Sequence, residues 1–405
     1  MSATRLSTPS QKSPPGLLRL LALFHESQSL GAGTSVVRAV DELAAFGWST
    51  SGWFPGNGTL PEVARERLAR CFEAERPIAF SARGWREDPG PLGRLRAAPS
   101  YAGAVRAALL DVRPHVVHAN TLLSLPEAAI ARSCGLPIVL QLHEIPDPGL
   151  KRTAALRAAG RVADVIVAVS QAVADIARTH VGRTPVLIVR NGVPEAAPAP
   201  PARSRTAPFV VGTVGTVSLV KGTDVFLRAA RIALEQRPHL RFEHVGAADL
   251  HRDDGLDEVL TRLHTTLPSG ALTMLGSRPA TNELRRWQVM VLPSRTEAFP
   301  LATLEAMATG IPVIASAVGG LPEQIEHERH GLLVPPDDPG ALAAAIVRLH
   351  DDDALRSRIG ETGAERVRRE FTLAAQARGF HHAYLTALDL RFAPPQVRAS
   401  VGAGS

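Results

Sequence analysis

Several residue types are scarce in this 405-residue chain, and each scarcity excludes a class of protein. The two cysteines, Cys71 and Cys134, are too few for a disulfide-stapled fold and lack metal-site spacing, so we expect a reducing, cytoplasmic compartment. Aromatic residues make up 4% of the chain and no basic run is interleaved with them, which disfavours nucleic acid as a partner. The first apolar run is broken by Arg19, which argues against a signal peptide or a membrane span.

Lysine is also rare, because only Lys12, Lys151 and Lys221 among the 45 basic residues are lysines. The charge is unevenly placed: residues 1–200 carry 22 basic and 16 acidic side chains, whereas residues 201–405 carry 23 of each. The basic first half favours peripheral contact with an anionic membrane face. A diffuse arginine-rich surface is the simpler explanation, because no dense basic run is present.

The abundant residue types and their order along the chain indicate a soluble α/β protein. Hydrophobic residues are 45% and charged residues 21% of a chain long enough for two domains. Short β-branched runs alternate with helical patterns, which predicts βαβ units with parallel sheets. The expected strands are LLRLLALF (17–24), HVVHAN (115–120), PIVLQLH (137–143), DVIVAVS (164–170), VLIVRNG (186–192), FVVGTVG (209–215), LRFEHVG (240–246), ALTMLG (271–276), VMVLPS (289–294) and IPVIAS (311–316).

The alternation stops once, at the proline-rich stretch PEAAPAPPARSRTAP, which reads as a linker. Ligands bind beyond the carboxyl ends of the strands in open parallel sheets, so two such domains predict a site in the cleft between them. The expected parts are a disordered start (1–15), a first Rossmann-like domain (16–193), the linker (194–207), a second Rossmann-like domain (208–372), a final helix (373–390) and a flexible tail (391–405).

One carboxylate, Glu305, stands in an apolar helical pattern that starts near Pro300 and ends at Gly310. Glu297 precedes it in the loop after a strand that ends at Pro293. Two ribose hydroxyls would satisfy the Glu305 carboxylate, and the helix N-terminus would suit a phosphate. A side chain that simply reaches solvent is the alternative explanation for Glu305.

The stretch PSRTEAFPLATLEAMATGIPVIASAVGGLPEQI, followed by HGLLVPPDD, resembles the donor-site signature of glycosyltransferase family 4. That family consists of retaining enzymes of the GT-B fold with two glutamates separated by seven residues. The resemblance covers roughly residues 17–388 and implies an α/β GT-B architecture, with two Rossmann-like parallel-sheet domains facing across a cleft. It also implies that the last helix returns to the first domain, which would bind the acceptor while the second domain binds a nucleotide-diphosphate sugar.

On this resemblance, Glu305 would hold the donor ribose and Glu297 would contact the transferred sugar. Backbone N–H groups of Phe299 and Leu301 would lie near the diphosphate or the sugar hydroxyls. The family often has glycine where this chain has Pro300, so one backbone donor is absent here.

The motif GTVGTVSLVKG (212–222) contains a second group of donor-site candidates. Lys221 would neutralise the β-phosphate of the leaving nucleotide diphosphate, and an ordinary surface lysine is the alternative. Family members commonly carry arginine directly after the glycine that matches Gly215, whereas this chain has Thr216. Arg295 or Arg278 could compensate for the missing cation.

In the expected first domain, QLHEIPDP places His143 and Glu144 at a strand end. The resemblance implies that His143 reaches the transferred sugar, while a structural histidine is the alternative. We expect His118 and Glu144 to contact the acceptor. Gly31 and Gly33, in a loop before a helix, match the family loop that approaches the donor phosphates, although such glycines often serve tight turns.

Neither a metal nor a cofactor is predicted beyond the sugar nucleotide itself. The acidic run Asp351-Asp352-Asp353 is better explained as a solvated turn, and no cluster has metal-ligand spacing. The prediction is therefore a metal-independent retaining glycosyltransferase with an unidentified acceptor: a glycan, a lipid-linked molecule or a small molecule. Two alternatives stay open, a GT-B epimerase or phosphorylase and a non-catalytic nucleotide-sugar-binding protein.

Overall fold

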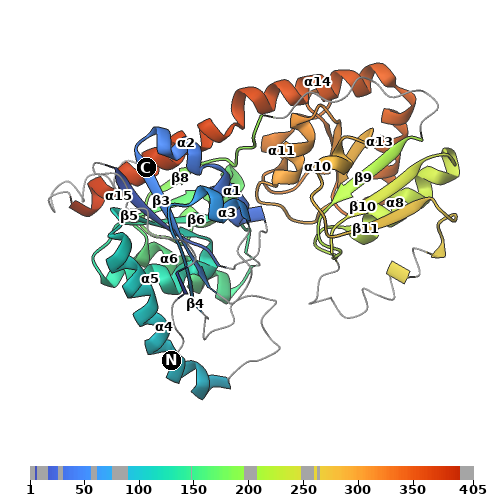
Figure 1. The fold of residues 1–405 in the computed structure, drawn as a ribbon. Helices are drawn as coiled ribbons and strands as arrows, with labels where there is room; N and C mark the ends of the chain where they lie inside the picture. The colour runs from blue at the N-terminus through green and yellow to red at the C-terminus, as the bar shows by residue number, and fades with distance from the viewer. Residues whose placement is uncertain are drawn as a thin grey trace. The chain divides into compact units, whose positions relative to one another are not determined.

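The structure is a computed structural model that describes most of the chain, in two compact units (Figure 1). The first unit comprises Met1–Gly192 and Leu373–Ser405, and the second comprises Val193–Thr372. The described residues are 5–6, 17–25, 31–55, 62–74, 90–146, 148–195, 208–247, 260–261 and 265–392. Strand residues 5–6 fall inside the expected disordered start, and the rest of that start, most of the expected linker and all but two residues of the expected tail lie outside these ranges.

The first unit is built on an eight-stranded sheet in the order β1-β4-β3-β2-β5-β6-β7-β8. Only the two-residue strand β1 runs antiparallel to its neighbour, and the other seven strands are parallel. The strands are β1 (Arg5–Leu6), β2 (Leu18–Leu23), β3 (Trp48–Pro55), β4 (Cys71–Ala74), β5 (Val116–Asn120), β6 (Ile138–Leu142), β7 (Val165–Ala168) and β8 (Val186–Ile188).

Helices complete the first unit on either side of the strands. The helical pattern SVVRAVDELAAFG, which ends at Gly47, predicts a single helix after the first strand, but the structure divides it in two at Ala39. The helices are α1 (Gly31–Arg38), α2 (Val40–Ala45), α3 (Glu62–Arg67), α4 (Gly90–Val112), the 3-10 turn η2 (Leu122–Ser124), α5 (Leu125–Ser133), α6 (Leu150–Val162), α7 (Gln171–Arg178) and α15 (Leu373–Phe392).

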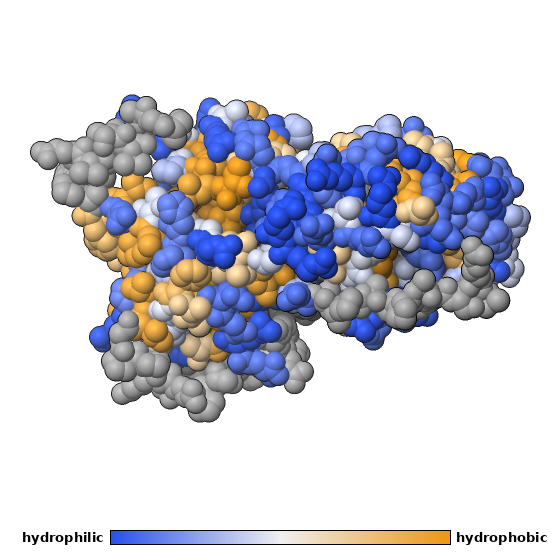
Figure 2. All heavy atoms as spheres, turned by 90° about the horizontal axis from the view of Figure 1, so that it is seen from above, coloured by the Kyte–Doolittle hydropathy of each residue, from blue (hydrophilic) through white to orange (hydrophobic). Residues whose placement is uncertain are grey.

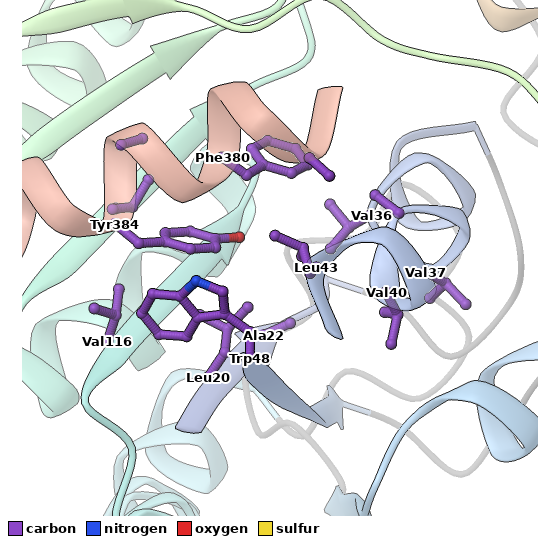
Figure 3. Packing of buried hydrophobic residues seen from close by; sticks show 14 of the residues in the cluster. Leu20, Ala22, Val36, Val37, Val40, Leu43, Trp48, Val116, Phe380 and Tyr384 are labelled. Atoms are coloured by element: carbon purple, nitrogen blue, oxygen red, sulfur yellow. The ribbon is translucent and has the colours of Figure 1, made fainter. Parts of the chain in front are cut away.

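Helix α15, the last helix that the structure describes, is part of the core of the first unit (Figure 3). Phe380 and Tyr384 point from it toward the strands, and the Tyr384 ring meets the edge of Trp48 at 5.0 Å between centroids. Val36 and Leu43, from α1 and α2, belong to the same buried cluster. Each large apolar side chain buried in this way contributes about 2 kcal/mol, so docking of α15 strongly stabilises this unit.

The second unit contains a six-stranded, wholly parallel sheet in the order β11-β10-β9-β12-β13-β14. Its strands are β9 (Val210–Val214), β10 (Arg241–Val245), β11 (Leu272–Gly276), β12 (Val289–Leu292), β13 (Val313–Ser316) and β14 (Leu332–Val334). Its helices are α8 (Thr223–Gln236), α10 (Thr281–Leu284), α11 (Leu301–Ala308), α12 (Leu321–Gln324), α13 (Pro339–Asp351) and α14 (Asp353–Glu370).

The prediction of two Rossmann-like parallel-sheet units is confirmed, and all ten expected strands are present. Strands β1, β3, β4 and β14 were not predicted from the sequence. Strand β3 (WSTSGWFP) contains serine, glycine and proline in place of a β-branched run, yet it is almost entirely buried. Strand β14 has only three residues, too few for a periodic pattern. None of the helices in the described ranges is long and apolar enough to span a lipid bilayer.

Candidate functional site

In the second unit, Glu297 lies in the segment that connects β12 to α11. Its carboxylate is almost buried, with 7% of the side chain exposed. The Oε1 atom accepts a hydrogen bond from Ser294 Oγ at 2.8 Å. The same atom forms an ion pair with Lys221 Nζ, also at 2.8 Å. Two donors on one oxygen fix the carboxylate and leave Oε2 for a further donor.

Lys221 reaches Glu297 because the loop after β9 packs tightly against the end of β12. Gly222 has φ +67°, and a Cβ atom there would lie 2.0 Å from the carbonyl oxygen of Pro293, so only glycine permits this approach. The backbone N–H of Lys221 donates to Ser218 Oγ at 3.2 Å. The ammonium therefore extends from a fixed backbone, with 34% of the side chain exposed.

Gly215 and Thr216 begin the same loop. A Cβ atom on Gly246 would lie 1.7 Å from the Gly215 carbonyl oxygen, so these two loops also approach at backbone distance. The nearest side chain to Gly215 is the Lys221 stem, 3.5 Å from an added Cβ atom. Thr216 is half-buried and carries no charge, so Lys221 is the cation that this loop presents beside Gly215.

Helix α11 presents one open face at its start. Pro300 is the N-cap residue rather than part of the first turn, with extended backbone angles, and Gly310 at φ +79° follows the end of the helix. Thr303, Leu304, Ala306, Met307 and Ala308 are buried, while Leu301, Ala302 and Glu305 are half-exposed. Because positions i, i+1 and i+4 share one side of a helix, Glu305 lies on the same side as Leu301 and Ala302, whose backbone N–H groups are at the helix N-terminus.

Phe299, just before this helix, has a buried side chain whose ring meets the edge of Phe371 at 5.5 Å between centroids. Its side chain packs into the protein, so any ligand contact at this position comes from the backbone. The predicted donor roles of Phe299, Leu301 and Glu305 rest on this geometry and stay predictions.

Arg295, which could compensate for the missing cation, is paired with protein groups in this structure. Its guanidinium forms a two-pronged pair with Asp224, at 2.8 and 2.9 Å, and contacts Asp337 Oδ1 at 2.6 Å and the Leu219 carbonyl oxygen. Burial would raise the pKa of Asp224, but the hydrogen bonds and charge of Arg295, together with the charge of Arg228 and a backbone hydrogen bond, outweigh burial and lower the pKa. Arg278 pairs with Glu283 at 3.3 Å. Both arginines are thus engaged by protein carboxylates.

In the first unit, His143 follows β6 and contacts the residue that ends β5. Its Nε2 atom lies 2.7 Å from Asn120 Oδ1, which only accepts hydrogen bonds, so Nε2 carries the proton. Burial, together with the nearby His118 and His25, lowers the pKa of His143 to about 3. The ring is therefore neutral at pH 7 and presents the Nδ1 lone pair as an acceptor for a ligand hydroxyl.

Glu144, the next residue, is also in a desolvated environment. Burial raises its pKa, while the charge of His25 and the backbone N–H of Leu122 act in the opposite direction. The half-buried carboxylate follows His143 at the carboxyl end of β6, where we expect an acceptor hydroxyl to bind.

The prediction that His118 contacts the acceptor is wrong. The ring has no exposed surface, and its two nitrogens contact Tyr384 Oη at 2.9 Å and Gln141 Oε1 at 3.0 Å. Burial lowers its pKa to about 4, so it is a neutral core histidine under α15. The sequence alone did not show that a helix more than 250 residues away covers this strand.

The expectation for the two glycines is also corrected in part. Gly31 and Gly33 lie in the first turn of α1, not in a loop before a helix. An added Cβ atom on Gly33 would meet Phe24 at an ordinary 3.6 Å, so no close packing explains this glycine. Residues 27–30, the start of the expected loop, lie outside the described ranges.

Three positions in these sites escaped the sequence analysis: Ser294, Asn120 and Thr121. Each lies at or just beyond the carboxyl end of a parallel strand, a placement that could have identified them. Asn120 is fully buried, and its Nδ2 atom has no hydrogen-bond partner among the residues that the structure describes. Thr121 has φ +132°, a conformation that β-branched residues rarely adopt and that is typical of functional sites.

The acidic run Asp351–Asp353 contributes to helix ends. Asp351 pairs with Arg237, and Asp352 is the N-cap of α14, where its Oδ1 atom accepts from the Leu355 N–H at 2.8 Å. Within the ranges that the structure describes, no group of three or more histidine, cysteine or acidic side chains is arranged to hold a metal.

Comparison with known proteins adds the family. The model for Glycosyltransferase Family 4 matches residues 30–196, and the model for Glycosyl transferases group 1 matches residues 208–352. A D-inositol 3-phosphate glycosyltransferase of Streptomyces avermitilis is 34% identical over 157 residues, 37% of this chain and 34% of that protein. The protein of the same name from Corynebacterium aurimucosum is 30% identical over 197 residues, 48% of this chain and 47% of that protein. The matches thus span between a third and a half of these relatives.

Solved structures share the fold over nearly the whole chain. HepE of Anabaena in complex with UDP-glucose superposes with a TM-score of 0.75 at 21% identity, covering 90% of this chain and 98% of that one. Sucrose-phosphate synthase from Thermosynechococcus elongatus has a TM-score of 0.73 at 22% identity, covering 95% and 100%. The fold class is therefore GT-B, as predicted. With a family model matched to each half, the chain belongs to the family 4 type of GT-B glycosyltransferases.

Proposed function

We propose that this protein is a retaining glycosyltransferase that uses a nucleotide-diphosphate sugar. The observation that carries the proposal is the grouping in the second unit of Lys221, Glu297 and the open first turn of α11 with Glu305. A cation, free helix N–H groups and a carboxylate suit a diphosphate and the hydroxyls of its ribose. The family match and the UDP-glucose bound to HepE support the same ligand class.

In the proposed reaction, the bond between the sugar C1 atom and the diphosphate oxygen breaks while the acceptor oxygen bonds to C1 from the same face. The acceptor proton passes to the leaving diphosphate. Lys221 and the first N–H groups of α11 stabilise the charge that develops on the β-phosphate. Glu297 holds a hydroxyl of the transferred sugar through Oε2. No protein nucleophile is needed, and neither a metal nor a further cofactor is part of the proposal.

The first unit would supply the acceptor side. The neutral His143, held through Nε2 by Asn120, would accept a hydrogen bond from a sugar or acceptor hydroxyl at Nδ1. Glu144 is the second candidate for acceptor contact. Gly31 and Gly33, in the first turn of α1, remain candidates for contact with the donor phosphates.

Location and membrane contact stay predictions. We propose a cytoplasmic protein with peripheral contact to the inner membrane face through its first unit. In support, helix α6 begins with Leu150, 89% exposed, next to the exposed Lys151. Figure 2 also shows hydrophobic residues gathered in patches on the first unit, while hydrophilic residues cover most of the visible face of the second.

The test is binding followed by product analysis. The parent protein should bind at least one of UDP, ADP or GDP in calorimetry, and Lys221→Ala and Glu305→Ala should each weaken that binding at least tenfold, since a charged contact to a ligand contributes about 1.5–3 kcal/mol. Unchanged affinity in both variants would show that the site assignment is wrong.

Product analysis separates the alternatives. Incubation with a labelled nucleotide sugar and an acceptor panel should give a product with the anomeric configuration of the donor. An isomerised sugar nucleotide would indicate an epimerase, and phosphate-dependent cleavage of a glycan would indicate a phosphorylase. Binding with neither transfer nor slow donor hydrolysis would indicate a non-catalytic binding protein.

A further inference from the structure

The two charged groups proposed to serve the donor bind each other in this structure. Lys221 Nζ lies 2.8 Å from Glu297 Oε1, and the same oxygen accepts from Ser294 Oγ at 2.8 Å. Ser294 is fully buried, and the Glu297 side chain is 7% exposed, so the carboxylate is removed from most of the water that would otherwise solvate it. A carboxylate in this setting needs its donors, because leaving a buried charge without partners is costly.

The geometry also shows which group can move. The backbone of Lys221 is fixed by Ser218, but its side chain is flexible and one-third exposed. Glu297 is held from beneath by Ser294 and has little freedom. An arriving diphosphate would therefore draw the ammonium away from Glu297, and the carboxylate would lose its charged donor.

We propose that Glu297 makes the donor site favour the intact sugar nucleotide over the spent nucleoside diphosphate. This inference rests on the proposed function. With the intact donor, Lys221 turns to the diphosphate while the sugar hydroxyls donate to Glu297, so both charges keep partners. The nucleoside diphosphate attracts Lys221 but offers Glu297 no hydroxyl. The carboxylate then competes with the phosphates for the ammonium and weakens product binding.

During turnover, the site would bind the nucleoside diphosphate more weakly once the sugar has been transferred. After transfer, Glu297 loses the sugar hydroxyls, and re-forming the 2.8 Å pair with Lys221 becomes its best way to recover a donor. The ion pair thus assists release of the diphosphate. No bond is made or broken in this exchange, only hydrogen bonds and one ion pair.

The test is calorimetry with Glu297→Gln. Glutamine has the same shape and keeps an oxygen for Ser294, but it has no charge to compete for Lys221. The probes are UDP, ADP and GDP with their glucose conjugates, and the pair that the parent protein binds is then used throughout. We expect about three- to fivefold tighter binding of the nucleoside diphosphate, the range of a partly exposed ion pair, and weaker binding of the sugar nucleotide.

In Glu297→Gln, the affinity should rise for the nucleoside diphosphate and fall for the sugar nucleotide. These opposite changes distinguish the exchange of partners from simple repulsion between Glu297 and phosphate. If Glu297 only repelled phosphate, its neutral variant would bind both ligands more tightly, and that result would overturn the inference. Ser294→Ala is the matched control, because it removes a neutral donor from the same oxygen and leaves both charges. Its affinity for the diphosphate should stay equal or fall, so a gain comparable to that of Glu297→Gln would also overturn the inference.

Different results would refute the proposed function and the inference about Glu297. If the parent protein binds none of the six probes, the proposed function itself is refuted. If the parent binds a diphosphate and Glu297→Gln binds it no more tightly, the donor site stands and the inference is refuted. Circular dichroism of Glu297→Gln and Ser294→Ala checks that both variants keep the parent fold.

Discussion

Replacing Arg295 with methionine should destabilise the second unit strongly, although the sequence suggested a role in phosphate binding. The guanidinium, 31% exposed, pairs through two hydrogen bonds with Asp224, whose side chain is 3% exposed. It also contacts Asp337 and the Leu219 carbonyl oxygen. These contacts join the segment after β12 to the start of α8, on either side of the loop that carries Lys221.

The magnitude follows from the burial of the partner that remains. Removing one member of a buried pair costs about 3–5 kcal/mol, because the other charge is left without compensation. Arg295 is one-third exposed and solvent screens part of the interaction, so we expect about 2 kcal/mol for Arg295→Met. Arg228→Met is the matched control: Arg228 reaches Asp224 at only 3.7 Å and is 48% exposed, so its loss should cost less than about 0.5 kcal/mol.

The assay is urea denaturation with and without saturating nucleotide. The transition that the nucleotide moves to higher urea belongs to the unit that binds it, so the loss can be assigned to the second unit. A double variant, Arg295→Met with Asp224→Asn, should recover at least about 1 kcal/mol, because no buried charge remains unpaired. Equal small losses in Arg295→Met and Arg228→Met would refute this reasoning. A normal stability with a tenfold loss of nucleotide affinity would restore Arg295 to the phosphate site.

Two further predictions concern the histidines of the first unit. His143→Ala should abolish transfer while keeping nucleotide binding. The parent pH–rate profile gives a second check. If it has a limb near pH 6.5 that disappears in His143→Gln, this histidine is not the neutral acceptor inferred from its pKa of about 3. The pKa of His118 is lowered from 6.5 to about 4, so the unfolded chain binds its proton more readily and the free energy of unfolding should fall by about 2 kcal/mol between pH 7 and pH 5. Urea denaturation of His118→Gln should show a shallower pH dependence, by about that amount, and an unchanged slope would contradict the burial assigned to the ring.

The fold was largely predictable, because most of the parallel strands are buried on both faces and therefore stand out in the sequence as short apolar runs. FVVGTVG and VMVLPS became β9 and β12, whose carboxyl ends carry the candidate donor residues. The same reasoning failed for β3, because Ser49 and Gly52 interrupt its strand-forming aromatic residues and leave no continuous β-branched run. It also placed a single helix where Ala39 separates α1 from α2.

The candidate site was predictable only for residues that lie close together in the sequence. The spacing of Glu297 and Glu305 follows from one strand end and one short helix, and both residues lie where the pattern put them. Their roles stay predictions. The identity of a partner is a different matter, because it depends on residues brought together by the fold. Lys221 meets Glu297 across 76 positions, and Arg295 meets Asp224 across 71.

This difference explains why Arg295 and His118 have protein partners that the sequence did not show, while the roles of the two glutamates stay predictions. A charged or titratable side chain at a strand end can either bind a ligand or pair with another buried group. Its position in the sequence does not distinguish between these two uses. Arg295 and His118 each have partners that account for their hydrogen bonds, Asp224 in one case and Tyr384 with Gln141 in the other. Lys221 differs from both, because its partner is itself a candidate ligand group and its side chain remains one-third exposed. A side chain whose only strong contact can be exchanged for a substrate is therefore a better candidate for function than one whose contacts are complete.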